Sequence, residues 1–186
     1  MEAFLVSTGV VAIAEIGDKT QLLAILLACR FRRPWPIVVG ILAATLANHA
    51  LAATVGTLVA AAVDPAVMRW ILGASFIAMG AWALIPDKVD DDEGQATGRL
   101  GAFLATTVAF FLVEMGDKTQ IATVALAARF ETIYAVTAGT TLGMMLANVP
   151  AVFLGEAVTR IVPLSVVRTA AAAIFVAVGV VTLAVA

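Results

Sequence analysis

The 186-residue sequence contains very little charge, one cysteine and one histidine. Lys and Arg number 11, Asp and Glu number 13, and together they make up only 13% of the chain, with a formal net charge of −2. The basic residues form no stripe, which argues against a nucleic-acid-binding protein. Because Cys29 has no second cysteine to pair with, an intrachain disulfide is excluded and nothing indicates a cysteine-based metal site.

Hydrophobic residues, in contrast, make up 62% of the chain, and the mean hydropathy is +1.06. A helix that crosses the hydrocarbon layer of a membrane needs about 20 apolar residues. The apolar runs are continuous, whereas the strands of a membrane β-barrel alternate apolar and polar residues. The first run lacks the basic segment of a cleaved signal peptide, so we expect it to be retained. The sequence therefore predicts an all-α integral membrane protein with six transmembrane helices, at about 4–29, 35–63, 67–85, 100–128, 133–158 and 164–186.

The most unusual stretch is a motif written twice, EIGDKTQ at residues 15–21 and EMGDKTQ at residues 114–120. Each copy places two carboxylates and one ammonium group inside an apolar run. A charged residue at the centre of a spanning helix costs about 2.5–3.5 kcal/mol, so six uncompensated charges would cost about 15–20 kcal/mol. A typical fold is stable by only about 5–15 kcal/mol. These charges must therefore be paired, face a polar interior or bind a ligand.

The similarity between the two halves extends beyond the motif. At an offset of 99 residues Gly40 matches Gly139 and Arg69 matches Arg168. Three helices are an odd number, so the second copy crosses the membrane in the opposite sense, as in the inverted repeats of many transporters. We expect one transmembrane domain over residues 1–186, with repeat one at about 1–86, an acidic linker at about 87–99 and repeat two at about 100–186.

The distribution of Lys and Arg in the short loops predicts the orientation, because cytoplasmic loops carry an excess of them. The arrangement with more cations on the cytoplasmic side, including Arg30, Arg32 and Arg33, places both termini outside. The acidic linker is then cytoplasmic.

On a continuous helix, Glu15, Asp18 and Gln21 share one face, and the second copy repeats this stripe of oxygen ligands. Gly17 and Gly116 allow close approach, bending or unwinding. Each copy carries a net −1, so both together carry −2, which one divalent cation or two protons would neutralise. Oxygen ligands favour hard cations such as Ca²⁺, Mn²⁺ and Mg²⁺. The principal candidate metal ligands are Glu15, Asp18, Glu114 and Asp117, the secondary ones are Gln21, Gln120, Asn48, Asn148, Thr20 and Thr119, and Lys19 and Lys118 balance charge.

Two further polar residues allow more than one interpretation. His49, next to Asn48, is either a softer metal ligand or proton relay, or a packing residue, and a lone helical histidine is more often the latter. Glu156, near the end of a predicted helix, is either a vestibule acid or an interfacial residue.

The doubled Glu-x-Gly-Asp-Lys-Thr motif in a six-helix chain resembles uncharacterised protein family 0016, the calcium:proton antiporter-2 group. That family includes Golgi and chloroplast cation/proton antiporters and bacterial manganese exporters. The resemblance covers essentially the whole chain and implies a Mn²⁺ or Ca²⁺ exporter whose acidic ligands are Glu15, Asp18, Glu114 and Asp117. The short chain and short linker resemble bacterial members, which implies Mn²⁺ efflux across the plasma (inner) membrane.

These observations predict a transporter and not an enzyme. We expect it to export Mn²⁺, or alternatively Ca²⁺, in exchange for protons by alternating access, without a prosthetic group. The expected partners are the metal ion, protons and the lipid bilayer, and a homodimer is one arrangement that remains open. The alternatives are a passive divalent-cation channel, an exporter of small organic cations or amino acids, for which Phe110 and Phe111 give weak support, and a membrane scaffold without transport.

Overall fold

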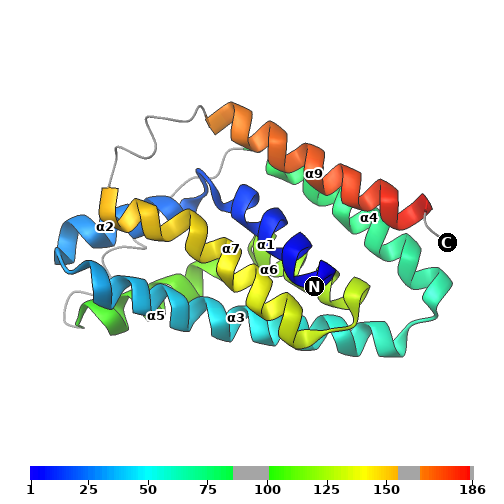
Figure 1. The fold of residues 1–186 in the computed structure, drawn as a ribbon, viewed down its shortest axis with the longest axis horizontal. Helices are drawn as coiled ribbons and strands as arrows, with labels where there is room; N and C mark the ends of the chain where they lie inside the picture. Colours follow the sequence, from blue (N-terminus) through cyan, green and yellow to red (C-terminus); the bar gives the residue numbers. More distant parts are fainter. Residues whose placement is uncertain (86–100, 155–163, 185–186) are drawn as a thin grey trace.

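The computed structural model describes residues 1–85, 101–154 and 164–184, and every element in these ranges is helical (Figure 1). The all-α prediction is therefore confirmed for the described chain. The acidic linker at 87–99 and Glu156 lie outside these residues. The helices are α1 (Glu2–Glu15), α2 (Lys19–Phe31), α3 (Pro34–Ala62), α4 (Pro65–Ala83), α5 (Ala102–Glu114), α6 (Lys118–Phe130), α7 (Ile133–Leu154) and α9 (Leu164–Ala184).

The predicted helices at 4–29 and 100–128 are wrong as continuous helices, because each is broken inside the motif. Gly17 has φ 78° and Gly116 has φ 82°, a left-handed conformation that glycine adopts at little cost. The residues on both sides of each glycine are extended. An extended residue cannot continue the i to i−4 hydrogen bonds of a helix. Each motif therefore joins two half-helices, α1 to α2 and α5 to α6.

The same backbone features occur in both halves of the chain. Besides the two glycines, Arg32 ends α2 with φ 51° and Glu131 ends α6 with φ 50°, both in the left-handed region. These two residues are 99 positions apart, as the glycines are. The sequence repeat is thus reproduced in the local structure, including its unusual conformations.

Each half packs its long helix against the broken helix of the other half. A Cβ atom built on Gly40 of α3 would lie 2.8 Å from the carbonyl oxygen of Phe103 in α5, and one built on Gly139 of α7 would lie 2.5 Å from that of Phe4 in α1. Helix α3 also approaches α6, because a Cβ on Gly56 would overlap with the Val124 carbonyl oxygen. Glycine is required at such close approaches of two backbones. The two halves are therefore interlocked.

Helices α4 and α9 form a separate pair along one edge of the molecule (Figure 1). Gly80 faces Val176, and Gly179 faces the backbone of Gly73. Phe76 and Phe175 are fully buried where the pair meets the rest of the bundle. Among the side chains that the structure describes, the pair carries few polar groups into the interior, which suits a supporting role.

The distribution of polarity is that of a membrane protein. Helices α3, α4 and α7 are long and apolar enough to cross a membrane, and α5 and the 169–184 part of α9 are shorter apolar helices. Large hydrophobic side chains such as Leu42, Leu58 and Leu146 are exposed, while carboxylates are buried. A large exposed apolar surface is typical of a protein–protein or membrane interaction surface. Figure 1 shows successive long helices running in opposite directions along the longest axis.

The close approach at Gly56 can be tested by adding one methyl group. We expect Gly56→Ala to destabilise the protein by about 1–3 kcal/mol, the usual cost of overpacking, because the Cβ would meet a backbone carbonyl of α6. Gly9→Ala is the matched control, since a Cβ there has no neighbour within 4 Å. Thermal unfolding in detergent should show a lower Tm only for Gly56→Ala. Equal Tm values for both variants would contradict this packing.

Candidate metal site

Three acidic residues from the two motif copies meet at the breaks in the helices. Glu15 is the last residue of α1, Glu114 is the last residue of α5, and Asp117 immediately precedes α6. One carboxylate oxygen from each lies within 4.8 Å of the other two. Two ligands of one ion at 2.0–2.6 Å from it lie at most roughly 4–5 Å apart. The three carboxylates are therefore close enough to share a metal ion.

This cluster is buried, and it is not saturated with hydrogen bonds. The exposed fractions are 0% for Glu15, 1% for Glu114 and 4% for Asp117. Among the described residues, Glu15 Oε1, Glu114 Oε2 and Asp117 Oδ2 have no hydrogen-bond partner. Buried polar atoms are normally paired, so an unpaired group needs an explanation. Three oxygen atoms left unpaired in one cluster are what a site for a cation or protons provides.

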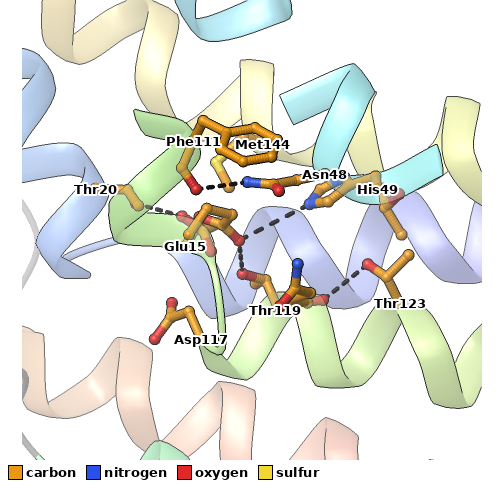
Figure 2. Close-up of polar contacts among 12 residues, drawn as sticks. Glu15, Thr20, Asn48, His49, Phe111, Asp117, Thr119, Thr123 and Met144 are labelled. Atoms are coloured by element: carbon orange, nitrogen blue, oxygen red, sulfur yellow. Dashed lines mark hydrogen bonds and ion pairs between the residues drawn. The ribbon is translucent and has the colours of Figure 1, made fainter. Parts of the chain in front are cut away.

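The two threonines of the motifs bind the two glutamates. Thr20 Oγ1 donates to Glu15 Oε2, and Thr119 Oγ1 donates to Glu114 Oε1 (Figure 2). Each bond leaves the second oxygen of the carboxylate available. The threonines, predicted as secondary ligands, thus orient the glutamates in this conformation.

The two glutamines hold the breaks in shape. The N–H of Gly17 donates to Gln21 Oε1 at 2.9 Å, and the N–H of Gly116 donates to Gln120 Oε1 at 2.6 Å. Gln21 Nε2 also donates to the carbonyl oxygen of Ala147 in α7 at 2.9 Å. The prediction that Glu15, Asp18 and Gln21 share one helical face is wrong, because the helix is interrupted between them.

A lysine connects the two motif copies. Lys19 Nζ lies 3.4 Å from Asp117 Oδ1, a contact between the halves in addition to any pairing inside one copy. Three carboxylates and this ammonium group sum to −3 + 1 = −2. The second motif lysine, Lys118, is buried and lies 5.9 Å from the ring centroid of Trp82 in α4.

Asp18 lies outside the three-residue group. It is buried, and its Oδ1 accepts a hydrogen bond from the backbone N–H of Lys19 at 2.8 Å, which caps the start of α2. A capping carboxylate also interacts favourably with the helix dipole. Of the four carboxylates predicted to share one ion, this conformation brings together three.

Two asparagines on the long unbroken helices are fully buried. Asn48 Nδ2 donates to the carbonyl oxygen of Phe111 at 3.0 Å, and Asn148 Nδ2 donates to that of Met144 at 3.1 Å. In both, Oδ1 has no hydrogen-bond partner in the part of the chain that is described. Both amide oxygens are therefore unpaired in this conformation, and their role as secondary ligands stays a prediction.

His49 lies against the cluster, where the sequence favoured a packing role. Its exposed fraction is 0%, and its Nε2 is 3.8 Å from Glu114 Oε1. Figure 2 shows Asn48 and His49 reaching from α3 towards the carboxylates at the breaks. The only signal for this in the sequence is that a polar pair interrupts an otherwise apolar run.

The chain is similar to a known protein family and to two curated proteins. A model of the family described as divalent cation/proton antiporter GDT1 matches residues 3–91 and 102–186. The chain belongs to this family. It is 49% identical over 176 residues to a protein of Vibrio cholerae serotype O1 named "Putative manganese exporter". The aligned region covers 94% of this chain and 87% of that relative. It is also 28% identical to a GDT1-like protein of Synechocystis sp., over 84% of each chain. No solved structure matches the chain.

Membership of the GDT1 family confirms the resemblance noted from the motifs. The protein is a transporter of divalent cations and protons and not an enzyme. Both helix breaks and both long helices that face them lie within the matched residues.

The left-handed glycine of the second break provides a test of this geometry. Gly116→Ala should destabilise the protein by about 1–2 kcal/mol, the cost of a Cβ in a left-handed conformation. Gly101→Ala is the control, because both glycines have open space around a new Cβ but Gly101 has φ −62°. The two variants would be compared by thermal unfolding in detergent. A loss of stability in both, or in neither, would show that the backbone at residue 116 is not held at positive φ.

Proposed function

We propose that the protein exports Mn²⁺ from the cytoplasm in exchange for protons by alternating access. The observation that carries this proposal is the buried cluster of Glu15, Glu114 and Asp117, in which each carboxylate keeps an unpaired oxygen. The family supplies the reaction class, the exchange of a divalent cation for protons. The name of the 49% identical relative supports Mn²⁺ as the cargo, with Ca²⁺ as the alternative.

Charge balance explains why such a site exchanges the two substrates. The three carboxylates and Lys19 carry −2 when empty, and an uncompensated charge is costly inside a membrane. One divalent cation neutralises this charge, and two protons do the same. Metal arriving from the cytoplasm displaces the protons, and protons from outside later displace the metal. The empty site is disfavoured, which couples the two movements.

Alternating access requires the halves of the molecule to move relative to each other. The site lies where the two halves meet, so such a movement opens it to one side and closes it to the other. In an inverted repeat the halves exchange conformations between the two states. Asp18 is the repeat counterpart of Asp117, and we propose that it replaces Asp117 at the ion in the opposite state. Asn48 and Asn148 add amide oxygens.

We further propose six spans in two inverted repeats, one at about 1–86 and one at about 100–186, in the bacterial inner membrane. The matched helix breaks and left-handed caps of the two halves support the repeat. Both termini lie outside and the linker at 87–99 lies in the cytoplasm, on the side of the cations at 30–33.

Two alternatives from the sequence are less well supported. The family is one of antiporters, which argues against a passive channel. An exporter of organic cations would need aromatic residues lining the cavity, whereas Phe110 is 1% exposed and packs in an apolar cluster with Leu23 and Ile41.

Removing a carboxylate charge tests the site directly. Glu114→Gln, Asp117→Asn and Asp18→Asn should each reduce proton-driven Mn²⁺ flux in proteoliposomes by about 100-fold or more, beyond the 10–100-fold loss typical of residues that only support metal ligands. Glu2→Gln is the control, because Glu2 is exposed at the start of α1. Gel filtration would verify that the variants remain folded. Unchanged Mn²⁺ flux in folded Glu114→Gln and Asp117→Asn protein would refute the site.

The net charge of −2 predicts exchange of one Mn²⁺ for two protons, with no net charge moved. Flux should then be independent of a membrane potential set with potassium and valinomycin. Moving one net charge across the membrane in each cycle would change the free energy of transport by about 2.3 kcal/mol per 100 mV. The flux of a charged cycle would therefore respond strongly to the membrane potential, and that of a neutral cycle would not. A potential-dependent flux would rule out this stoichiometry, and flux without any proton movement would favour a channel.

A further inference from the structure

His49 is a fully buried imidazole whose two nitrogen atoms, Nδ1 and Nε2, have no hydrogen-bond partner among the described residues. A buried histidine normally donates one ring N–H to a fixed acceptor, which sets its tautomer and orientation. Packing alone does not explain a buried ring with two unpaired polar atoms, since an apolar residue would fill the same space without that cost.

The position of the ring relative to the carboxylates fits a shared ion. The distance of 3.8 Å between His49 Nε2 and Glu114 Oε1 is too long for a hydrogen bond. Two ligands held at 2.0–2.6 Å from one ion are separated by roughly 3 Å when adjacent and by roughly 4–5 Å when opposite. A distance of 3.8 Å lies between these values, so the ring nitrogen and the Glu114 carboxylate are close enough to share an ion.

The repeat places a polar residue at this position in both halves and a histidine in one of them. At the offset of 99 residues that aligns Gly40 with Gly139, His49 of α3 corresponds to Asn148 of α7. Both side chains are 0% exposed, so the second half has an amide where the first half has an imidazole. Glu15, Thr20 and Gln21 each have an identical counterpart 99 residues later, so His49 is a nitrogen donor that the site possesses in one copy.

We propose that His49 is a nitrogen ligand of the transported ion and that it makes the site prefer Mn²⁺ to Ca²⁺. This inference rests on the function proposed above and specifies its cargo. Ca²⁺ is bound by oxygen ligands. Imidazole suits transition metals, whose affinity for nitrogen exceeds that of the hard alkaline-earth ions. One nitrogen among carboxylate and amide oxygens therefore shifts the preference from Ca²⁺ towards Mn²⁺.

The ligand can be detected directly, because the chain contains one histidine. Protein purified without a histidine tag and labelled with ¹⁵N-histidine would be loaded with Mn²⁺ alone and studied by pulsed electron paramagnetic resonance. We expect a ¹⁵N coupling from the imidazole in the wild type and its loss in His49→Gln, which offers an amide oxygen instead. Bound Mn²⁺ without this coupling in the wild type would overturn the proposal.

Transport selectivity gives a second, independent measure. His49→Gln should lower the ratio of kcat/KM for Mn²⁺ to that for Ca²⁺ at least about tenfold, mainly by raising KM for Mn²⁺. The control is Thr140→Ala, because Thr140 is equally buried and its hydroxyl donates to carbonyl oxygens of its own helix. An unchanged ratio in active His49→Gln protein would overturn the ligand role of His49. The proposed exchange of Mn²⁺ for protons is tested separately, and it fails only if the wild type does not move Mn²⁺ against protons.

Discussion

The structure depends on one constraint, the free energy of keeping several charged groups inside an apolar bundle. A buried carboxylate is tolerated only where hydrogen bonds, an opposite charge or a bound cation compensate for the lost hydration. Each compensating element is visible. Thr20 and Thr119 donate to the glutamates, Lys19 approaches Asp117 across the two halves, and unpaired oxygens remain for a cation.

The helix breaks are the means by which these groups are brought together. A continuous helix would hold its backbone carbonyls and amides in hydrogen bonds, whereas an interrupted helix presents free polar ends. Gly17 and Gly116 permit the interruption, and the glutamine amides satisfy the backbone N–H groups that it releases. The long helices α3 and α7 are unbroken at the site and hold the asparagines and His49 against the breaks. Irregular backbone inside a membrane protein is tolerated where it is shielded from lipid in this way.

Because the two halves are interlocked, the site is formed by residues of both. Gly40 and Gly139 allow the long helix of each half to lie against the broken helix of the other, so neither half forms the site alone. Although the halves share their backbone features, the cluster itself is not symmetric. Asp117 belongs to it and Asp18 caps a helix, and His49 faces Glu114 at the position where the second half has Asn148. The two similar halves therefore contribute different groups to one site.

The sequence by itself determined the helical class, the apolar exterior, the duplication and the residues that carry charge, because composition and a repeat with an offset of 99 residues are local properties of the chain. It also identified all three carboxylates that meet, together with Asp18, which lies outside their group. It did not determine that the motif helices are broken, since glycine permits a helix as well as a turn and the choice is made by neighbouring helices. The tertiary structure alone decided three further features. Lys19 contacts Asp117, Asp117 and not Asp18 joins the cluster, and His49 faces Glu114. The Lys19–Asp117 and His49–Glu114 contacts, and the approach of Glu15 to the second motif, join residues 65 or more positions apart, and the packing of the two halves against each other brings them within reach.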